Sequence, residues 1–310
     1  MFSVIFPGQG SQTVGMAMEL YNKFEIVKKI FKSVDDVLGY SLSNIVFNGS
    51  TSDLNLTKNT QPAIMTVGYS IYTILKNEFN INLNSGRFFA GHSLGEYTAL
   101  VCAKSLKLET AAYLLHERGK AMQDAVPVNK GLMLAILGLN IDDVIKEIGL
   151  VSFNGVCEIA NDNCPGQVVV SGNKETIHEL ENILKKKSIR SIILPVSAPF
   201  HCSLMKNAAK NMSEKIYNSK FNKPEPSIIS NVTAKPENNV EQIRELLVKQ
   251  ITSMVKWRES INYMIENGTT EFIEIGPGKI LSGLIKRINR KVKISNINSF
   301  TDMKNYKKND

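Results

Sequence analysis

The chain has 310 residues, of which 43% are hydrophobic, so it can bury a substantial core in one large or two modest domains. No apolar run approaches the roughly 18 residues of a membrane span, and residues 1–6 lack the basic leader of a signal peptide. The net charge of +8 favours an anionic partner, and the four cysteines form no CxxC pair, which indicates reduced thiols and a cytoplasmic protein.

The first 127 residues alternate strand and helix. A strand is predicted at 2–6, followed by helical segments to about residue 80, a strand at 87–91 and long helices to about residue 124. Such alternation is typical of a parallel sheet with helices packed on its faces. The expected fold class is therefore α/β.

The segment 128–197 breaks this alternation. Its pattern predicts strand 132–137, helix 141–148, strands 157–161 and 167–171, helix 174–187 and strand 189–194. That order, βαββαβ, is the order of a ferredoxin-like unit. We therefore predict a small ferredoxin-like domain over 128–197, inserted into a larger α/β domain that comprises 1–127 and 198–310.

The α/β alternation resumes after the insert. The expected elements are helix 203–218, strand 227–230, helices 240–252 and 257–267, strand 270–275, helix 279–289 and strand 292–297. The polar end, 302–310, is expected to fray.

The sequence Gly-His-Ser-Leu-Gly at 91–95 is the strongest catalytic signal of the chain. It follows an apolar run and precedes a helical segment, the strand–turn–helix context of a nucleophile elbow. Glycines two residues before and after Ser93 permit the sharp turn that presents its hydroxyl. The alternative is that Ser93 only caps a helix behind a turn.

A nucleophilic serine needs a base, and the chain has four histidines. His92 adjoins the serine and is expected to line its loop, His116 lies in a helical run, and His178 lies outside the apolar stripe of another helix. His201 follows the strand at 189–194 and a proline-held turn, a place where rigid scaffolds position catalytic groups. His201 is the predicted base, with a buried structural histidine as the alternative.

The glycine-bearing loop at 6–12 follows the first predicted strand. It matches neither the GxxxxGK[ST] nor the GxGxxG spacing of phosphate-binding loops. Acyl transfer needs two backbone N–H groups aimed at the developing oxyanion, and a glycine-relieved loop beside the elbow can supply one. The expected pair is the amides of Gln9 and Leu94.

Two clusters of basic residues carry part of the net charge: Lys185, Lys186, Lys187 and Arg190, and then Lys286, Arg287, Arg290 and Lys291. Aromatic residues are not interleaved with them and neither matches a reader motif, so nucleic acid is not expected as a partner. The clusters are either solvated helix faces or surfaces that attract a polyphosphate or an acidic carrier protein.

Taken together, these residues resemble one family. The matching segments are 6–12, 60–63, 91–96, 117–119, 160–163, 165–167, 200–201, Gln250 and 276–279. They resemble malonyl-CoA:acyl-carrier-protein transacylases, in the family's order, from residue 2 to about 297. The fold that this resemblance implies is a hydrolase-like α/β catalytic domain bearing a ferredoxin-like insert, which matches the segmentation above. The resemblance implies ping-pong transfer of malonyl from malonyl-CoA to the phosphopantetheine thiol of acyl carrier protein for fatty acid synthesis. It implies no metal or redox cofactor, because the coenzyme A thioester is itself a substrate.

The resemblance also implies catalytic roles for individual residues. Ser93 would carry the malonyl ester, His201 would act as base and then as acid, and the backbone carbonyl of Gln250 would orient the histidine. The amides of Gln9 and Leu94 match the oxyanion hole of the family.

The same resemblance implies a substrate pocket. Arg118 would grip the free malonyl carboxylate, since a planar guanidinium binds carboxylate bidentately; without the resemblance it would be taken for a surface charge. Phe200 matches the malonyl-selective form of the Phe-His dipeptide, whose ring leaves little room for an α-methyl group. Gln61 and Met122 match pocket-lining positions.

Two alternatives stand beside this hypothesis. A serine esterase or thioesterase would use the same serine and histidine, but ordinary ester substrates carry no anion for Arg118. A non-catalytic carrier-binding protein would tolerate the loss of Ser93 or His201, and both residues are present.

Overall fold

The computed structural model describes residues 1–127 and 129–307, and its larger unit is built on a sheet with the strand order β10-β9-β1-β2-β7-β8. All neighbouring strands pair in parallel except β8, which pairs antiparallel with β7. The strands are β1 (Phe2–Phe6), β2 (Phe89–Gly91), β7 (Ile228–Ile229), β8 (Pro236–Glu237), β9 (Glu271–Ile275) and β10 (Lys293–Ile297). The expected α/β class with a parallel sheet is confirmed.

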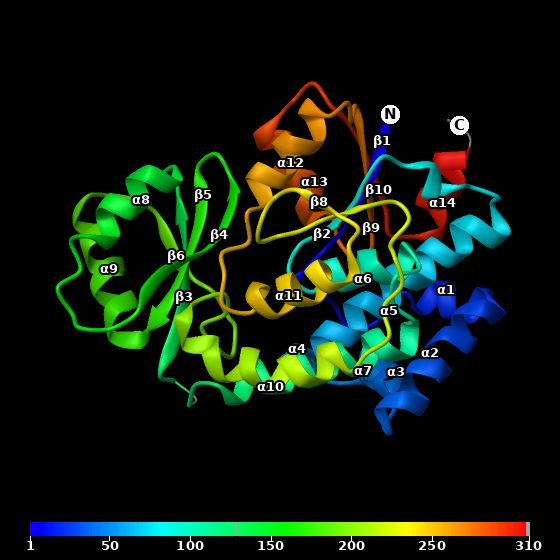
Figure 1. Cartoon of the computed structure of the whole chain (residues 1–310), viewed down its shortest axis with the longest axis horizontal. Coiled ribbons are helices and arrows are strands. Elements are labelled where there is room, and N and C mark those ends of the chain that lie inside the picture. The colour runs from blue at the N-terminus through cyan, green and yellow to red at the C-terminus, as the bar shows by residue number, and fades with distance from the viewer. Residues whose placement is uncertain (128, 308–310) are drawn as a thin grey trace.

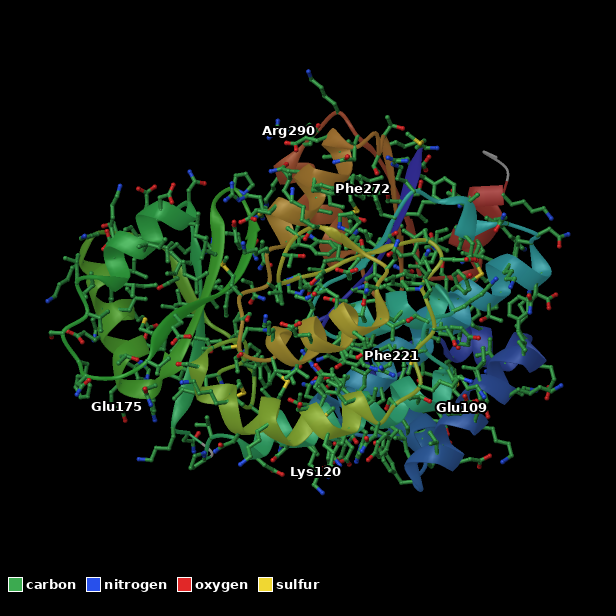
Figure 2. All side chains as sticks on the ribbon, viewed as in Figure 1. Glu109, Lys120, Glu175, Phe221, Phe272 and Arg290 are labelled. Atoms are coloured by element: carbon green, nitrogen blue, oxygen red, sulfur yellow. The ribbon has the colours of Figure 1, made fainter. Side chains whose placement is uncertain are left out.

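Helices cover both faces of this sheet, so four of the five residues of β1 are buried, the polar Ser3 included. Val4 and Phe6 point into one core and Ile5 into the other, because successive side chains alternate across a strand. The first core includes residues of α5 (Thr57–Glu78), α6 (Gly95–Cys102) and α7 (Leu108–Asp124). The second includes Phe272, labelled in Figure 2, with residues of α12 (Trp257–Glu266) and α13 (Ile280–Ile288).

The other helices of the larger unit lie around these layers. They are α1 (Met18–Lys23), α2 (Glu25–Leu38), α3 (Leu42–Asn48), α4 (Thr51–Asn55), α10 (Lys206–Tyr217), α11 (Val240–Gln250) and α14 (Phe300–Lys307), with single 3-10 turns at Leu83–Ser85 and Ser203–Met205. None of the helices within 1–127 and 129–307 combines the length and the hydropathy that crossing a bilayer requires.

The expected fraying of 302–310 is wrong as far as Lys307. The end of the chain forms α14, whose Met303 is fully buried and joins the main core. Phe300 and Tyr306, also in this helix, pack against the same core, a docking that the polar composition of the segment did not indicate. Residues 308–310 lie outside the described residues.

A second sheet, with the strand order β4-β5-β3-β6, forms the smaller unit. Its elements are β3 (Gly131–Leu137), α8 (Ile141–Ile148), β4 (Cys157–Cys164), β5 (Gln167–Asn173), α9 (Lys174–Lys186) and β6 (Ser191–Ile193). The strands are antiparallel, and Figure 1 shows α8 and α9 together on the face turned away from the larger unit. Val128, the first residue of the predicted insert, lies outside the described residues.

The smaller sheet is tied to the larger unit through β4. The backbone of Val255 donates to Ala160 O at 2.8 Å and accepts from Asp162 N at 3.0 Å. The Arg258 guanidinium, on α12, donates to the Asp162 carboxylate, with Nη2 2.8 Å from Oδ2. The register of β4 against β5 is irregular, and Asn163 Oδ1 of this strand lies 2.9 Å from Nε2 of His92, the residue after β2.

Candidate active site

The predicted elbow is a sharp turn between β2 and α6, with Ser93 in the left-handed region at φ +53°. The turn is so tight that a Cβ on Gly91 would lie 1.9 Å from the Gly95 carbonyl carbon. A Cβ on Gly95 would lie 2.3 Å from the Phe6 carbonyl oxygen. Both flanking positions therefore require glycine, as the motif indicated.

Asn231, at the end of β7, holds this turn in place. Its Oδ1 accepts from the Ser93 backbone N–H at 2.7 Å, and its Nδ2 donates to the Gly91 carbonyl at 2.7 Å. A non-glycine residue whose backbone lies in the left-handed region is strained, so this conformation persists only where the surrounding structure holds it. These two hydrogen bonds are that restraint.

Ser93 and His201 form a hydrogen-bonded pair. Ser93 Oγ lies 2.8 Å from His201 Nε2, and His201 Nδ1 lies 2.9 Å from the backbone carbonyl of Gln250. A carbonyl only accepts, so Nδ1 carries the proton and Nε2 is free to accept from the serine hydroxyl. Burial, followed by the positive charge of Arg118, lowers the pKa of His201 to about 3, so the histidine is in its basic form at neutral pH.

Arg118, on α7, is a buried cation directed at the nucleophile. Its Nη1 donates to Gln61 Oε1 at 2.7 Å, and its Nη2 donates to Gln250 Oε1 at 2.8 Å and to Ser93 Oγ at 3.1 Å. These partners are uncharged, and within the described chain the Arg118 Nε has no hydrogen-bond partner. An arginine with 1% exposure and neutral partners leaves a buried charge for an anionic ligand to compensate.

Eight of the nine residues predicted for the site line one cavity of about 370 Å³. Ser93, Arg118 and His201 are joined there by Gln9, Gln61, Leu94, Met122 and Phe200. The ninth, Gln250, is fully buried behind the cavity and reaches it through Arg118 and His201. The cavity is also lined by residues that were not among the predicted site residues, including Thr51, Asn55, Leu194, Val196 and Asn161, the last from the matching segment 160–163.

A buried carboxylate lies behind the elbow as well. Glu96 Oε2 accepts from Gln250 Nε2 at 2.8 Å and from the Asn231 backbone N–H at 3.0 Å. Burial raises its pKa to about 7. Glu96 belongs to the recognised motif, so its position was visible in the sequence, but nothing local indicated a contact with Gln250.

The remaining histidines take other places. His92 is in the elbow loop, where its Nε2 lies 2.9 Å from Asn163 Oδ1, as its predicted loop-lining place suggested. His116 contacts the backbone carbonyl of Lys58, and neither His116 nor His178 lines the cavity. Across 1–127 and 129–307, no group of three or more His, Cys, Asp or Glu side chains is arranged to hold a metal.

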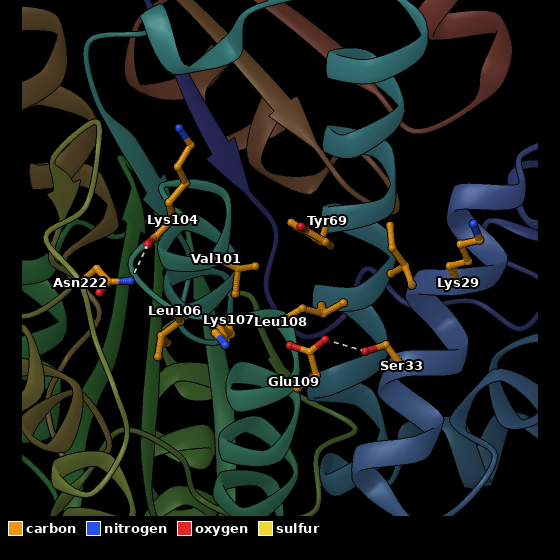
Figure 3. Close-up of a pocket in the computed structure, with 11 residues that line it drawn as sticks. Lys29, Ser33, Tyr69, Val101, Lys104, Leu106, Lys107, Leu108, Glu109 and Asn222 are labelled. Carbon is orange, nitrogen blue, oxygen red and sulfur yellow. Dashed lines mark hydrogen bonds between the residues drawn. The ribbon is translucent and has the colours of Figure 1, made fainter.

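A second cavity, of about 470 Å³, lies among α2, α5 and the start of α7 (Figure 3). Lys29, Lys104 and Lys107 are among the residues that line it, and Glu109 accepts from Ser33 Oγ at 2.6 Å. None of the predicted site residues lines it, so it is separate from the chemistry around Ser93.

A serine on a nucleophile elbow, paired with a histidine in an α/β sheet protein, defines a class of acyl-transferring serine enzymes. The chain matches the acyl transferase domain family over residues 3–310 and belongs to it. It is 41% identical over 291 residues to the malonyl CoA-acyl carrier protein transacylase of Bacillus subtilis, covering 93% of this chain and 90% of that protein. The resemblance expected from the sequence motifs is confirmed.

Solved structures agree with this assignment. The acyl-carrier-protein-S-malonyltransferase of Bartonella henselae superposes with a TM-score of 0.95 at 40% identity, covering 98% of each chain. A malonyl-transacylase solved in complex with a type II PKS acyl-carrier protein superposes with a TM-score of 0.95 at 36% identity, covering 100% of this chain and 99% of that one. The chain is therefore an acyltransferase.

Proposed function

We propose that this enzyme transfers malonyl from malonyl-CoA to the phosphopantetheine thiol of acyl carrier protein, in fatty acid synthesis, through a malonyl ester on Ser93. The observation that carries the proposal is the buried Arg118, whose Nη2 lies 3.1 Å from Ser93 Oγ. A malonyl ester on that oxygen has a free carboxylate one methylene beyond its carbonyl, within reach of the guanidinium. The names of the relatives and the solved carrier complex support the same substrates.

In the first half-reaction, Ser93 Oγ attacks the thioester carbonyl of malonyl-CoA while its proton passes to His201 Nε2. The backbone amides of Gln9 and Leu94 donate to the developing oxyanion. The C–S bond then breaks, and the leaving thiolate takes the proton from His201. Coenzyme A departs as the free thiol, and the malonyl group remains as an ester.

The second half-reaction runs the same steps on the carrier. His201 takes the proton of the phosphopantetheine thiol, the thiolate attacks the malonyl ester, and the C–O bond to Ser93 breaks. The proton returns from His201 to Ser93 Oγ. The hydrogen bond from His201 Nδ1 to Gln250 O keeps the imidazole in one tautomer throughout, so a carbonyl serves where many such enzymes use an acidic residue.

The substrate also tunes the base. The positive charge of Arg118 is the second cause that lowers the pKa of His201. A malonyl carboxylate paired with Arg118 offsets that charge, so the histidine becomes a stronger base when the acyl group is in place. An ester lacking a carboxylate would leave the charge uncompensated, which argues against a general esterase or thioesterase.

Several finer features belong to the proposal. Phe200, Gln61 and Met122 shape the acyl pocket, and Phe200 excludes an α-methyl group. The segment 128–197 is a ferredoxin-like insert, supported by its strand order β4-β5-β3-β6 and by α8 and α9 on one face. The enzyme works in the cytoplasm without a metal or redox cofactor, since the coenzyme A thioester supplies the activated acyl group.

Intact-protein mass spectrometry tests the proposal directly. The protein mixed with malonyl-CoA should gain one malonyl group, which the holo carrier protein should then remove. The Ser93→Ala variant should gain none, because no other group completes the ester. A malonyl adduct that persists in the variant would refute the assignment of Ser93.

A further inference from the structure

We propose that Glu96 is a positioning residue for acyl selectivity: its carboxylate fixes the side-chain amide of Gln250, and through that amide the direction of Arg118. The inference rests on the proposed function, because it concerns the group that recognises the malonyl carboxylate. Glu96 is not among the residues that line the cavity, so it would act on the substrate only through Gln250 and Arg118.

The side-chain amide of Gln250 has two unlike ends, and the structure uses both. Its oxygen accepts from Arg118 Nη2 at 2.8 Å. Its nitrogen donates to Glu96 Oε2 at 2.8 Å, and lies farther from Ser93 O at 3.2 Å and Asn231 Oδ1 at 3.4 Å. If the amide turned over, two donors would face each other at Arg118, so the strongest acceptor at the other end decides the orientation.

Glu96 is itself held rigidly, as such a role requires. Its side chain starts from the first turn of α6, it is 3% exposed, and Oε2 also accepts from the backbone N–H of Asn231 at 3.0 Å. Asn231 in turn holds the Ser93 backbone N–H. One connected set of hydrogen bonds therefore fixes both the nucleophile and the amide that directs Arg118.

A buried carboxylate is costly to retain, so its place calls for a compensating function. Packing alone would be met by an apolar side chain of similar size. What the site needs from residue 96 is an oxygen acceptor that faces Gln250. A glutamine at this position can supply that oxygen, whereas alanine cannot, and aspartate withdraws it by one methylene.

Selectivity is the property that separates this role from a merely structural one. If Arg118 turns away from Ser93, a malonyl group loses its partner, whereas an acetyl group has no carboxylate to lose. The change should therefore fall on the malonyl substrate. A weakened fold would instead slow both acyl groups together.

The experiment compares Glu96→Ala, Glu96→Gln and the wild type. The rates of Ser93 acylation by malonyl-CoA and by acetyl-CoA are measured with excess enzyme, and the melting temperature of each variant is recorded. Glu96→Ala should lower the malonyl-to-acetyl ratio by roughly 10-fold to 100-fold, since misplacing an orienting group by about 1 Å costs about 10²-fold. Glu96→Gln should restore most of the ratio, and Glu109→Ala, an exposed glutamate labelled in Figure 2, should leave it unchanged.

Two results would overturn the inference. One is an unchanged ratio in Glu96→Ala, whether or not both rates fall; the other is a Glu96→Gln variant as unselective as Glu96→Ala. If Glu96→Ala does not fold, Glu96→Asp decides in its place: a lowered ratio supports the inference and a retained ratio overturns it. A wild-type protein that takes no malonyl group would instead refute the proposed function, so the two failures are distinguishable.

Discussion

Replacing Arg118 by alanine tests how the site recognises its substrate. The side chain is 1% exposed, and its guanidinium donates to Gln61, Gln250 and Ser93. In the proposed complex, the malonyl carboxylate becomes its only charged partner. Truncating one member of such a desolvated pair costs about 2–5 kcal/mol.

This free energy converts directly to a rate. At about 1.4 kcal/mol per factor of ten, Arg118→Ala should lower kcat/KM for malonyl-CoA by about 30-fold to about 4,000-fold. Acetylation of Ser93 should fall little or rise, because removing the positive charge also removes one cause of the lowered pKa of His201. Arg118→Lys should recover only part of the malonyl rate, since an ammonium cannot bind the carboxylate bidentately.

The assay follows acylation of Ser93 by malonyl-CoA and acetyl-CoA in parallel. Lys120→Ala is the matched control, because Lys120 is an exposed cation on the same helix, labelled in Figure 2. An equal loss for both acyl groups in Arg118→Ala would show that the arginine supports the fold and does not select the substrate. A retained malonyl rate would place the carboxylate elsewhere.

Four further outcomes are expected. His201→Ala should slow both half-reactions by about 10²-fold to 10⁴-fold in single-turnover assays, and a normal rate would identify another base. Between pH 6.5 and about 3 the unfolded chain protonates His201 and the folded protein does not, so the free energy of unfolding decreases as the pH is lowered through this range. Urea unfolding should show a smaller decrease in His201→Asn, and an equal decrease would contradict the lowered pKa. Asn231→Ala leaves two backbone groups without their hydrogen-bond partner and should lower the free energy of unfolding at pH 7 by about 1–3 kcal/mol for each. An unchanged free energy would mean that the elbow is stable without Asn231. Charge reversal of Lys185, Arg190 and Arg287, all exposed, should raise KM for the acidic carrier and leave malonylation by malonyl-CoA unchanged; no effect would make them solvated charges.

Regular elements with one clear periodicity were predictable from the sequence. The strand at 2–6 and the helix at 141–148 have the predicted bounds, because each carries an uninterrupted pattern between clear end signals. The helix expected over 203–218 instead begins with a 3-10 turn, Ser203–Met205. The Ser203 backbone N–H donates to Glu158 Oε2 at 2.9 Å, and the Ser203 hydroxyl donates to Glu158 Oε1 at 2.5 Å. Helical periodicity in the sequence cannot reveal this contact with β4.

The candidate site divides in the same way. Ser93 was recognisable because its turn is encoded by its own neighbours, and His201 because few histidines compete with it. Asn231 was not recognisable, because it follows a strand of only two residues and the turn around it has no distinctive sequence pattern. Its importance comes from two contacts with residues about 140 positions earlier in the chain, which only the folded sheet creates.

The central place of β1 has a consequence for biosynthesis. This strand is synthesised well before one of its two neighbours, β9, since Phe2 pairs with Glu271. Contacts of such sequence separation form slowly and late in folding. Until Asn231 and Gln250 have emerged, a nascent chain carries Ser93 on an unrestrained loop, without its backbone anchor or the carbonyl that orients its base. The enzyme should therefore gain its reactivity only after these later segments have been made, which spares the growing chain from premature acylation.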